Sequence, residues 1–363
     1  MINILLLTPL TGNGGIASWS RKFINTFESD KYRVIPIDRS VKGRAFEDKR
    51  VWSRIWAGLK EMIVIRKKVK NAIRAAHIDI LHTTTSGSFG TFRDYFMAQI
   101  CCNAGVKRIM HCRYGCIPED LQKPLYGWFL RETMRRFDQI WVLDNSSAKA
   151  IRKFPDLANK VYVTPNSIEV PVFAEIPSKQ YTHVAFIANL MPTKGLFELL
   201  EAFIKLDDQD MQLSIVGKGE DAVVKKIKQQ SGDRLDKTIH LLGQLPNDKA
   251  VEFMKSIDIL ALPTYMQYEA FPISILEAMS LGKLVISTHR AAIGDMLTSL
   301  DGTPCGVFVA EKSVDDLVAA LAWCRNNKTD ADRLCTKAYE KVYHKYRMEV
   351  IYELYASLYD KLC

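Results

Sequence analysis

The chain has 363 residues, of which 48% are hydrophobic and 25% charged, and its 50 Lys and Arg exceed its 41 Asp and Glu by nine. This length suggests two domains with sizeable hydrophobic cores, and this composition excludes a disordered or fibrous protein. Since no apolar run approaches the ~18 residues of a membrane span, we expect a soluble globular chain.

The beginning of the chain and its cysteines indicate the cellular compartment. Residues 1–12 have neither a basic first segment nor a small-residue cleavage site, so they are expected to form a first strand rather than a signal peptide. The eight cysteines show no C-x-x-C spacing. We therefore expect a reducing, cytoplasmic environment.

The first half of the chain alternates short apolar segments with amphipathic helical patterns. Apolar segments of this length are typical of strands buried on both faces of a parallel sheet, and the helical patterns between them indicate repeated βα units. We predict six strands, at residues 2–7, 33–37, 79–82, 108–111, 139–143 and 160–164.

The second half begins this pattern again, and a connector rich in turn residues precedes it at 165–172. We predict an α/β fold of two doubly wound Rossmann-like domains, residues 1–170 and 171–344, with a Tyr-rich helix near the end of the chain. Ligands are expected at the carboxyl ends of the strands. The five predicted strands of the second domain are residues 183–188, 212–217, 239–243, 258–263 and 284–288.

The positive charge is concentrated in the first predicted domain. Residues 1–170 carry 28 basic and 15 acidic side chains, whereas residues 171–363 carry 22 and 26. Eleven of the basic residues lie in 42–74, where helical spacing aligns an apolar stripe of Trp52, Ile55, Trp56, Leu59 and Ile63. Most such stripes pack on their own domain. A basic helix with Trp on its apolar face also suits an anionic membrane surface, so both interpretations stay open.

A glycine-rich segment follows the first predicted strand. Glycines let the backbone approach a phosphate, and the N-terminus of the following helix offers unpaired N–H groups. Residues 12–17 also fit G-x-G-x-x-A, with Asp38 ending the second strand, so an NAD(P)-dependent oxidoreductase is an alternative. Four residues separate the strand from Gly12, however, where that motif needs an immediate turn. A basic nucleic-acid-binding protein is a third hypothesis, without any recognisable nucleic-acid-binding signature.

Two glutamates lie close together in residues 264–282. Glu269 is expected in a loop at the start of a helix, and Glu277 lies two turns further on in that helix. Such carboxylates can accept hydrogen bonds from sugar and ribose hydroxyls, while the N–H groups of 270–273 face a diphosphate. Two glutamates alone are more simply explained by a surface helix with solvated acids.

The residues around these glutamates resemble the E-G-F-P…L-E-A-M…G signature of the family-4 retaining glycosyltransferases, which have the two-domain GT-B fold. That fold places two Rossmann-like domains across a cleft, and its last helix crosses back onto the first domain, as we expect for residues 345–363. The resemblance rests on Glu269, Phe271-Pro272, Leu276-Glu277-Ala278-Met279 and Gly282, and extends to Gly14-Gly15-Ile16-Ala17, VTPNSI (163–168), Lys194-Gly195, SIVGKG (214–219) and residues 241–265.

The resemblance implies a role for each matched residue. Glu277 would hold the donor ribose hydroxyls, Glu269 the hydroxyls of the transferred sugar, and Lys194 would neutralise the diphosphate in place of a metal ion. His111, which ends the fourth predicted strand, matches a histidine that contacts the donor sugar, although alone it is more simply a buried strand-end histidine, as is His82. The other predicted donor-binding residues are Gly14, Gly15, Asn189, Gly217, Leu242, Ala270, Phe271, Pro272 and Ile273.

Two residues depart from the family pattern. Asn189 stands where the family has Arg, so a guanidinium that would bind the phosphates is missing, and Lys218 or Arg113 is a candidate replacement. Ala270 stands where Gly is usual, which leaves the loop unstrained only if φ is negative there.

The resemblance also implies the reaction. A retaining transferase would move a sugar from a nucleoside-diphosphate sugar to an acceptor hydroxyl, without a metal or other cofactor, by stabilising the leaving diphosphate electrostatically. The implied acceptor is a lipid-pyrophosphate-linked glycan or another precursor of a bacterial surface polysaccharide, such as lipopolysaccharide or capsule. We expect a cytoplasmic enzyme with no nucleic-acid partner, and residues 42–74 are the candidate contact either for the inner face of the cell membrane or for the acceptor pyrophosphate.

Overall fold

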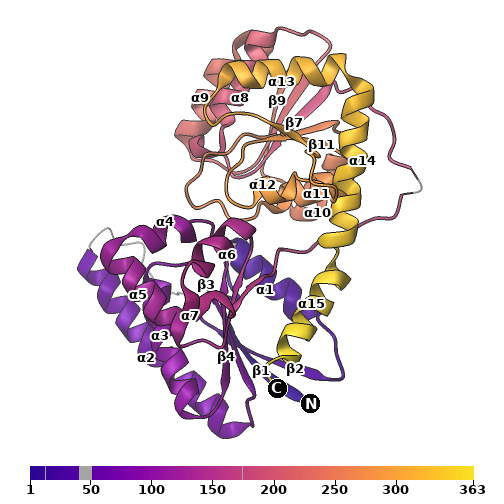
Figure 1. Cartoon of the computed structure of the whole chain (residues 1–363). Coiled ribbons are helices and arrows are strands. Elements are labelled where there is room, and N and C mark those ends of the chain that lie inside the picture. Colours follow the sequence, from indigo (N-terminus) through magenta and orange to yellow (C-terminus); the bar gives the residue numbers. More distant parts are fainter. Residues whose placement is uncertain (13, 41–50, 174) are drawn as a thin grey trace. The chain divides into compact units, whose positions relative to one another are not determined.

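The computed structural model describes residues 1–12, 14–40, 51–173 and 175–363, without the side chains of 51–57, 59 and 89. The chain forms two compact units, each with a parallel sheet and helices on its faces (Figure 1). The first unit comprises Met1–Thr164 together with Tyr352–Cys363, and the second comprises Pro165–Ile351. The chain therefore leaves the first unit once and returns to it with its last residues.

The first unit is built on six parallel strands in the order β2-β1-β3-β4-β5-β6. The apolar side chains of β1 from Ile4 to Leu7 are all buried, as expected of an inner strand covered on both faces. Strand order reverses between β1 and β3, so the carboxyl edge of these two strands is the expected ligand side. The strands are β1 (Ile2–Thr8), β2 (Tyr32–Asp38), β3 (Ile80–Thr85), β4 (Lys107–Cys112), β5 (Gln139–Val142) and β6 (Val161–Val163).

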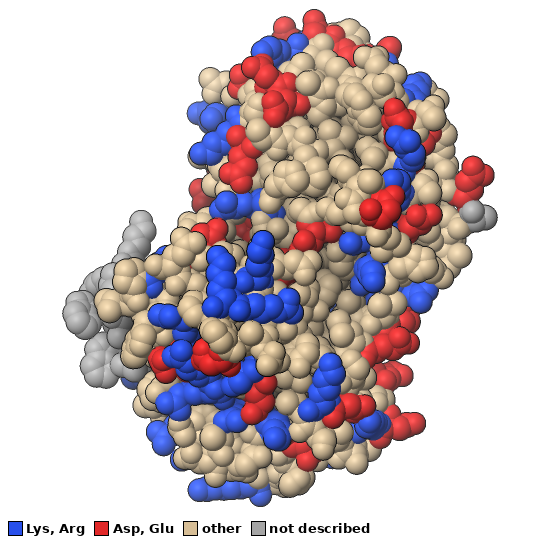
Figure 2. Space-filling view, in the orientation of Figure 1, with Lys and Arg blue, Asp and Glu red and all other residues tan. Residues whose placement is uncertain are grey.

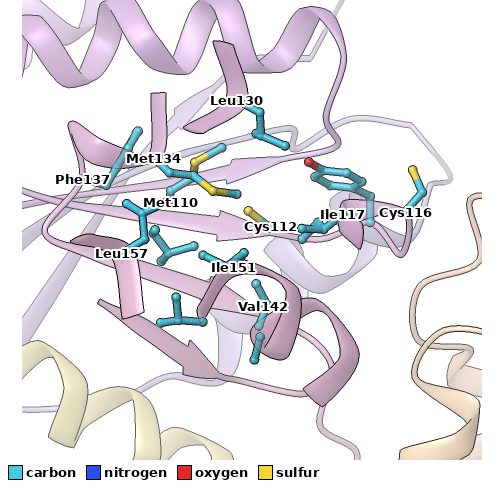
Figure 3. Close-up of a cluster of buried hydrophobic side chains, with 14 of the residues drawn as sticks. Met110, Cys112, Cys116, Ile117, Leu130, Met134, Phe137, Val142, Ile151 and Leu157 are labelled. Carbon is cyan, nitrogen blue, oxygen red and sulfur yellow. The ribbon is translucent and has the colours of Figure 1, made fainter. Parts of the chain in front are cut away.

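Helices cover both faces of the first sheet. One core cluster joins β4 and β5 to helices α4, α5 and α6, where Met110, Val142 and Leu130 are fully buried (Figure 3). The helices are α1 (Gly15–Thr26), α2 (Val51–Ala75), α3 (Phe89–Asn103), α4 (Ile117–Gln122), α5 (Pro124–Arg135), α6 (Asn145–Arg152), α7 (Pro155–Ala158) and α15 (Met348–Asp360), whose last residues belong to this unit.

The second unit is built on six parallel strands in the order β12-β11-β10-β7-β8-β9. Strand order reverses between β7 and β10. The strands are β7 (His183–Ile187), β8 (Gln212–Val216), β9 (Ile239–Gly243), β10 (Ile259–Leu262), β11 (Leu284–Ser287) and β12 (Val307–Phe308). The helices are η2 (Pro192–Lys194), α8 (Leu196–Leu206), α9 (Asp221–Ser231), η3 (Gly232–Arg234), α10 (Asn247–Lys255), α11 (Ile273–Ser280), α12 (Ile293–Met296), α13 (Val314–Asn326) and α14 (Lys328–Lys345).

The predicted fold class is confirmed: both units are doubly wound parallel α/β sheets, and all eleven predicted strands are present. The two-residue strand β12 was not predicted, because so short a segment carries no periodic signal. Among the described helices, none combines the length and the apolarity needed to cross a bilayer.

The basic segment 42–74 is described only in part. Residues from Val51 onward form the long helix α2, but residues 42–50 and the side chains of Trp52, Ile55, Trp56 and Leu59 lie outside the described parts of the chain. Figure 2 shows Lys and Arg gathered on the displayed face of the first unit and interspersed with acidic residues on the second.

Candidate active site

Lys194 and Glu269 meet at the point where strand order reverses in the second sheet. Lys194 follows β7 and Glu269 follows β10, the two strands on either side of that reversal. Their side chains form an ion pair and are only 13% and 8% exposed. Ligands of open α/β sheets bind at this carboxyl edge, so both topology and charge indicate a ligand position at this pair.

Two glycines make this edge compact. Gly195 has φ +76, and a Cβ there would lie 2.1 Å from the carbonyl oxygen of Pro263, at the end of β10. Gly217 has φ +154, and a Cβ there would lie 1.8 Å from the carbonyl oxygen of Ala188. Only glycine fits either position. The K-G and V-G-x-G motifs thus bring the loops after β7, β8 and β10 into direct backbone contact.

Thr264 holds the carboxylate of the pair, and the sequence analysis missed it. Its fully buried side chain donates from Oγ1 to Glu269 Oε2 at 3.2 Å. The next residue, Tyr265, donates its N–H to the Thr193 carbonyl at 2.9 Å, which ties the loop after β10 to the residue before Lys194. The position of Thr264 directly after a buried strand was the available signal.

Helix α11 carries the second glutamate. Glu277 lies inside the helix and is only 8% exposed, so it is not a solvated surface acid. The helix begins at Ile273 after Pro272, with no side-chain cap and no acid in its first turn. Its first N–H groups and its positive dipole end are therefore open to an anion. Ala270 is not among the residues with positive φ, so alanine at this position causes no backbone strain.

A residue near the start of the second unit holds the loop that precedes α11. Asn166, which is buried, donates from Nδ2 to the Phe271 carbonyl at 3.2 Å. The Phe271 ring packs edge-on against Tyr346, with ring centroids 5.6 Å apart. The P-N-S-I segment of the sequence thus positions the E-A-F-P loop, a contact that spacing along the chain could not reveal.

Three further predicted donor residues lie at the neighbouring strand ends. Asn189 follows β7, and the next residue, Leu190, donates its N–H to the Lys218 carbonyl at 2.7 Å. Lys218 is exposed, and its backbone pairs with the residue next to Asn189, so this candidate replacement for the family's Arg lies in the same unit as Asn189. Gly217 donates its N–H to Gly243 at 2.8 Å, and Leu242 beside it is 43% exposed, as a residue that packs on a base would be.

In the first unit, the glycine loop after β1 lies at the equivalent carboxyl edge. Gly14 caps helix α1 and Gly15 begins it, and both are exposed with open space where a side chain would be. The Asp38 carboxylate beside this loop is held by hydrogen bonds. Its Oδ1 accepts hydrogen bonds from the N–H groups of Leu10 at 3.0 Å and Ser40 at 2.8 Å. The acid of the dinucleotide pattern therefore has a structural use, which removes the main support for the oxidoreductase alternative.

His111 is fully buried in the first unit, and both its ring nitrogens are engaged. Nε2 lies 3.1 Å from Nη1 of Arg113, and Nδ1 lies 3.1 Å from Nε2 of His82. His82 Nδ1 lies 2.7 Å from the Tyr359 hydroxyl on α15. A guanidinium can only donate, so Nε2 of His111 accepts. Nδ1 of His111 then donates to His82, and Nδ1 of His82 donates to Tyr359.

This chain of hydrogen bonds requires both histidines to be neutral. Burial lowers the pKa of His82 to about 3, with a smaller contribution from the Arg113 charge. Burial, then Arg113 and His82, also hold the pKa of His111 well below its usual value. The Arg113 guanidinium that contacts His111 Nε2 also stacks over the Trp19 ring of α1, 4.1 Å from its centroid. His111 is fully buried and is therefore not presented to solvent.

The predicted site residues thus form two groups. Lys194, Glu269, Glu277 and 270–273 gather at one edge of the second sheet with Asn189, Gly217 and Leu242 at adjacent strand ends, while Gly14, Gly15 and His111 belong to the first unit. In the described parts of the chain, no three His, Cys, Asp or Glu side chains cluster as metal ligands would.

Residues 172–341 match the family model described as glycosyl transferases group 1. The second unit matches a group 1 glycosyl transferase domain over most of its length. Lys194, Glu269, Glu277 and the N-terminus of α11 lie within the matched range, whereas Asn166 and Tyr346 lie just outside it. The predicted resemblance to a glycosyltransferase family is confirmed at the level of group 1.

Relatives of the chain carry glycosyltransferase names. It is 24% identical over 215 residues to the amylovoran biosynthesis glycosyltransferase AmsK of Erwinia amylovora, covering 56% of this chain and 52% of that protein. It is 25% identical over 180 residues to the N,N'-diacetylbacillosaminyl-diphospho-undecaprenol alpha-1,3-N-acetylgalactosaminyltransferase of Campylobacter jejuni, covering 49% and 44%. The chain spans 36–59% of the length of the first five curated relatives that it matches.

The fold extends beyond the group 1 domain. The crystal structure of Anabaena HepE in complex with UDP matches 99% of this chain and 100% of its own, with a TM-score of 0.75 at 16% identity. At this identity the likeness establishes the fold alone. Both units therefore have the fold of GT-B glycosyltransferases, as the resemblance implied.

Proposed function

We propose that this protein is a retaining glycosyltransferase that uses a nucleoside-diphosphate sugar as donor. The observation that carries the proposal is the nearly buried Lys194–Glu269 pair at the strand-order reversal of a group 1 domain, beside the uncapped N-terminus of α11. A cation, a carboxylate and open N–H groups at one edge suit a sugar joined to a diphosphate, because phosphates take donors and hydroxyls take carboxylate acceptors.

The mechanism follows from the charge that develops as the diphosphate departs. Lys194 and the first N–H groups of α11 would stabilise that charge, Glu269 would orient the sugar hydroxyls, and Glu277 the ribose. Leu242 would pack on the base, and Lys218 would supply the cation that the family places at 189. The departing phosphate would accept the proton of the acceptor hydroxyl, and the reaction would need no metal ion.

We propose that the first unit contributes the acceptor side. Gly14 and Gly15 would bring backbone N–H groups to a phosphate, and His111 would contact the donor sugar through Nε2, once Arg113 has released that atom. The Campylobacter relative's name specifies a diphospho-undecaprenol substrate, which supports a lipid-pyrophosphate-linked glycan as the acceptor here. Such an acceptor places the enzyme on the inner face of the membrane, with 42–74 as the contact.

The test is a screen of nucleotide sugars for donor hydrolysis by the purified protein, with mass detection of the released nucleotide. One donor should be cleaved, and saturating EDTA should leave the rate unchanged. The anomeric configuration of the product, read by NMR, should match that of the donor. Tight binding of NAD with no binding of UDP or GDP in calorimetry would overturn the proposal.

A further inference from the structure

Three helices of the first unit leave an apolar surface uncovered. Helices α2, α3 and α5 lie side by side along one flank of the unit (Figure 1). Of the large hydrophobic side chains exposed in the described chain, six belong to these helices, and Leu125 is 86%, Ile63 65% and Trp128 55% exposed. The six are Ile63 and Val64 on α2, Phe92 and Phe96 on α3, and Leu125 and Trp128 on α5. We call them the flank residues.

The flank residues other than Val64 form one surface rather than scattered positions. Ile63 and Phe96 line the same groove between α2 and α3, and Phe92 lies one turn from Phe96. The Phe92 ring stacks on Phe129 of α5, with centroids 4.3 Å apart, and Phe129 lies one turn from Leu125. A contiguous apolar surface of this kind marks an interaction site, whereas single exposed hydrophobic residues need no explanation.

The groove between α2 and α3 has a volume of about 500 Å³ and combines an apolar floor with a cationic rim. Its floor comes from Met62, Met97 and Ile100, and its rim carries Arg66 and Lys70. The rest of α2 strengthens the charge, because Lys67, Lys68 and Arg74 follow and its one acidic residue is Glu61. An apolar slot edged by cations is complementary to a hydrocarbon chain that ends in an anionic phosphate.

We propose that α2, α3 and α5 form a lipid-docking surface for an anionic bilayer, in which the groove takes one acyl chain and Arg66 and Lys70 bind its phosphate. Leu125, Trp128 and Phe92 enter the boundary between headgroups and acyl chains, where aromatic and aliphatic side chains with flanking cations are stable. The proposal deepens the membrane contact of the proposed function. It moves that contact from the stripe at 52–63 to a surface spread over three helices.

The charge on the rim decides between the possible occupants. A second copy of this chain would bring the same cations to the contact, so a face-to-face dimer through the flank would set Arg66, Lys67 and Lys70 of the two copies against each other. An anionic lipid surface removes that repulsion, and each Lys or Arg near it raises the partition coefficient about fivefold. A bilayer is therefore the occupant that satisfies both the apolar area and the charge.

The experiment is sedimentation of the full chain with vesicles of phosphatidylcholine alone or with phosphatidylglycerol added. Wild-type protein should bind the phosphatidylglycerol vesicles. Leu125→Ser/Trp128→Ser should lower the partition coefficient at least tenfold, and Arg66→Glu/Lys67→Glu at least about 25-fold, since two cations are lost. All four side chains are exposed, so neither variant disturbs the core. The matched controls in the second unit, Val172→Ser and Lys225→Glu/Lys228→Glu, should bind as wild type does.

Three outcomes would overturn the proposal. The first is vesicle binding that does not depend on phosphatidylglycerol, and the second is binding by the flank variants equal to that of wild type. The third is a concentration-dependent dimer in analytical ultracentrifugation that Trp128→Ser abolishes, since the flank would then join two copies. Donor hydrolysis without vesicles, measured on the same samples, tests the proposed function separately. If the wild-type protein binds vesicles but hydrolyses no donor, the enzyme assignment is refuted and the proposed lipid-docking surface is not.

Discussion

At the scale of single residues, the nearly buried Lys194–Glu269 pair combines structural and chemical demands. Removing one partner leaves the other charge buried and uncompensated, which costs about 3–5 kcal/mol, whereas replacing both by uncharged residues of similar size can leave the stability unchanged. Stability and catalysis can therefore be separated at this pair, because the proposed chemistry would need the charges and the fold would not.

The separation uses three variants, Lys194→Met, Glu269→Gln and the double variant. Each single variant should lower the free energy of unfolding, and the double variant should recover most of it. All three should lower transfer at least ~100-fold, the scale of a lost transition-state interaction. Urea unfolding and turnover with the identified donor measure the two effects. Turnover within a factor of a few of wild type in the double variant would contradict the proposed roles.

The neutral histidine pair predicts a pH dependence of stability. In the unfolded chain His82 and His111 take up protons near pH 6.5, but burial holds the pKa of His82 at about 3 and that of His111 well below its usual value. Their contribution is therefore complete above pH 6.5 and is lost as the pH falls from there toward 3, by up to about 1.4 kcal/mol per pH unit for each histidine.

Urea unfolding at intervals between pH 7.5 and 5 measures this slope before most carboxylates titrate. The slope should shrink in His82→Gln and remain in His344→Gln, where the replaced histidine is exposed. Equal slopes in all three proteins would contradict a lowered pKa of His82 in the folded state.

At the scale of elements, the position of Lys194 depends on the backbone packing at the carboxyl ends of the strands more than on the strands themselves. Gly195→Ala places a Cβ 2.1 Å from the Pro263 carbonyl oxygen at φ +76, whereas Gly302→Ala meets open space at a similar φ of +83. The Gly302 variant should lose only the ~1–2 kcal/mol of a left-handed non-glycine residue.

Gly195→Ala should lose more stability than Gly302→Ala, because the loop carrying Lys194 must move away from β10. The transfer rate of Gly195→Ala should fall as well. Thermal unfolding and turnover of the two variants test this. An equal loss of stability in the two glycine variants would mean that the contact between the two loops adapts without any loss of free energy of unfolding.

The sequence predicts these elements where buried apolar residues recur regularly along the chain. Strands buried on both faces, such as β1 and β7, stand out as apolar runs between helical patterns, and the motif residues cluster after them as topology requires. It was silent on individual side-chain contacts. The bonds from Thr264 to Glu269 and from Asn166 to Phe271 leave no periodic trace, and His111 packs against Tyr355 of α15, more than 200 residues further on.

At the scale of the whole molecule, the first unit depends on the last residues of the chain. Tyr355 and Tyr359 are fully buried in it, Trp141 stacks on Tyr355 at 5.0 Å, and Tyr359 ends the histidine chain. Each buried aromatic contributes about 3–5 kcal/mol on the scale of truncation to alanine. Their combined loss is comparable to the ~5–15 kcal/mol that stabilises a typical domain.

Deletion of 352–363 should therefore remove the unfolding transition of the first unit and leave that of the second. Differential scanning calorimetry of the full and shortened chains measures this directly. The milder Tyr359→Phe removes only the hydroxyl that accepts from His82 and should lower the first transition by a few degrees. An unchanged first transition in the shortened chain would show that α15 does not complete that core.

The return of the chain into its first unit also sets an order of assembly during synthesis. The ribosome releases Pro165–Ile351, all of the group 1 domain, before it releases Tyr352–Cys363. The second unit can thus fold while the first still lacks the helix that seals its sheet, in reverse of the usual N-terminal-first order. Until Tyr352–Cys363 emerge, Trp19, Trp141 and the two histidines stay exposed on one side, and a chaperone can bind this aromatic surface.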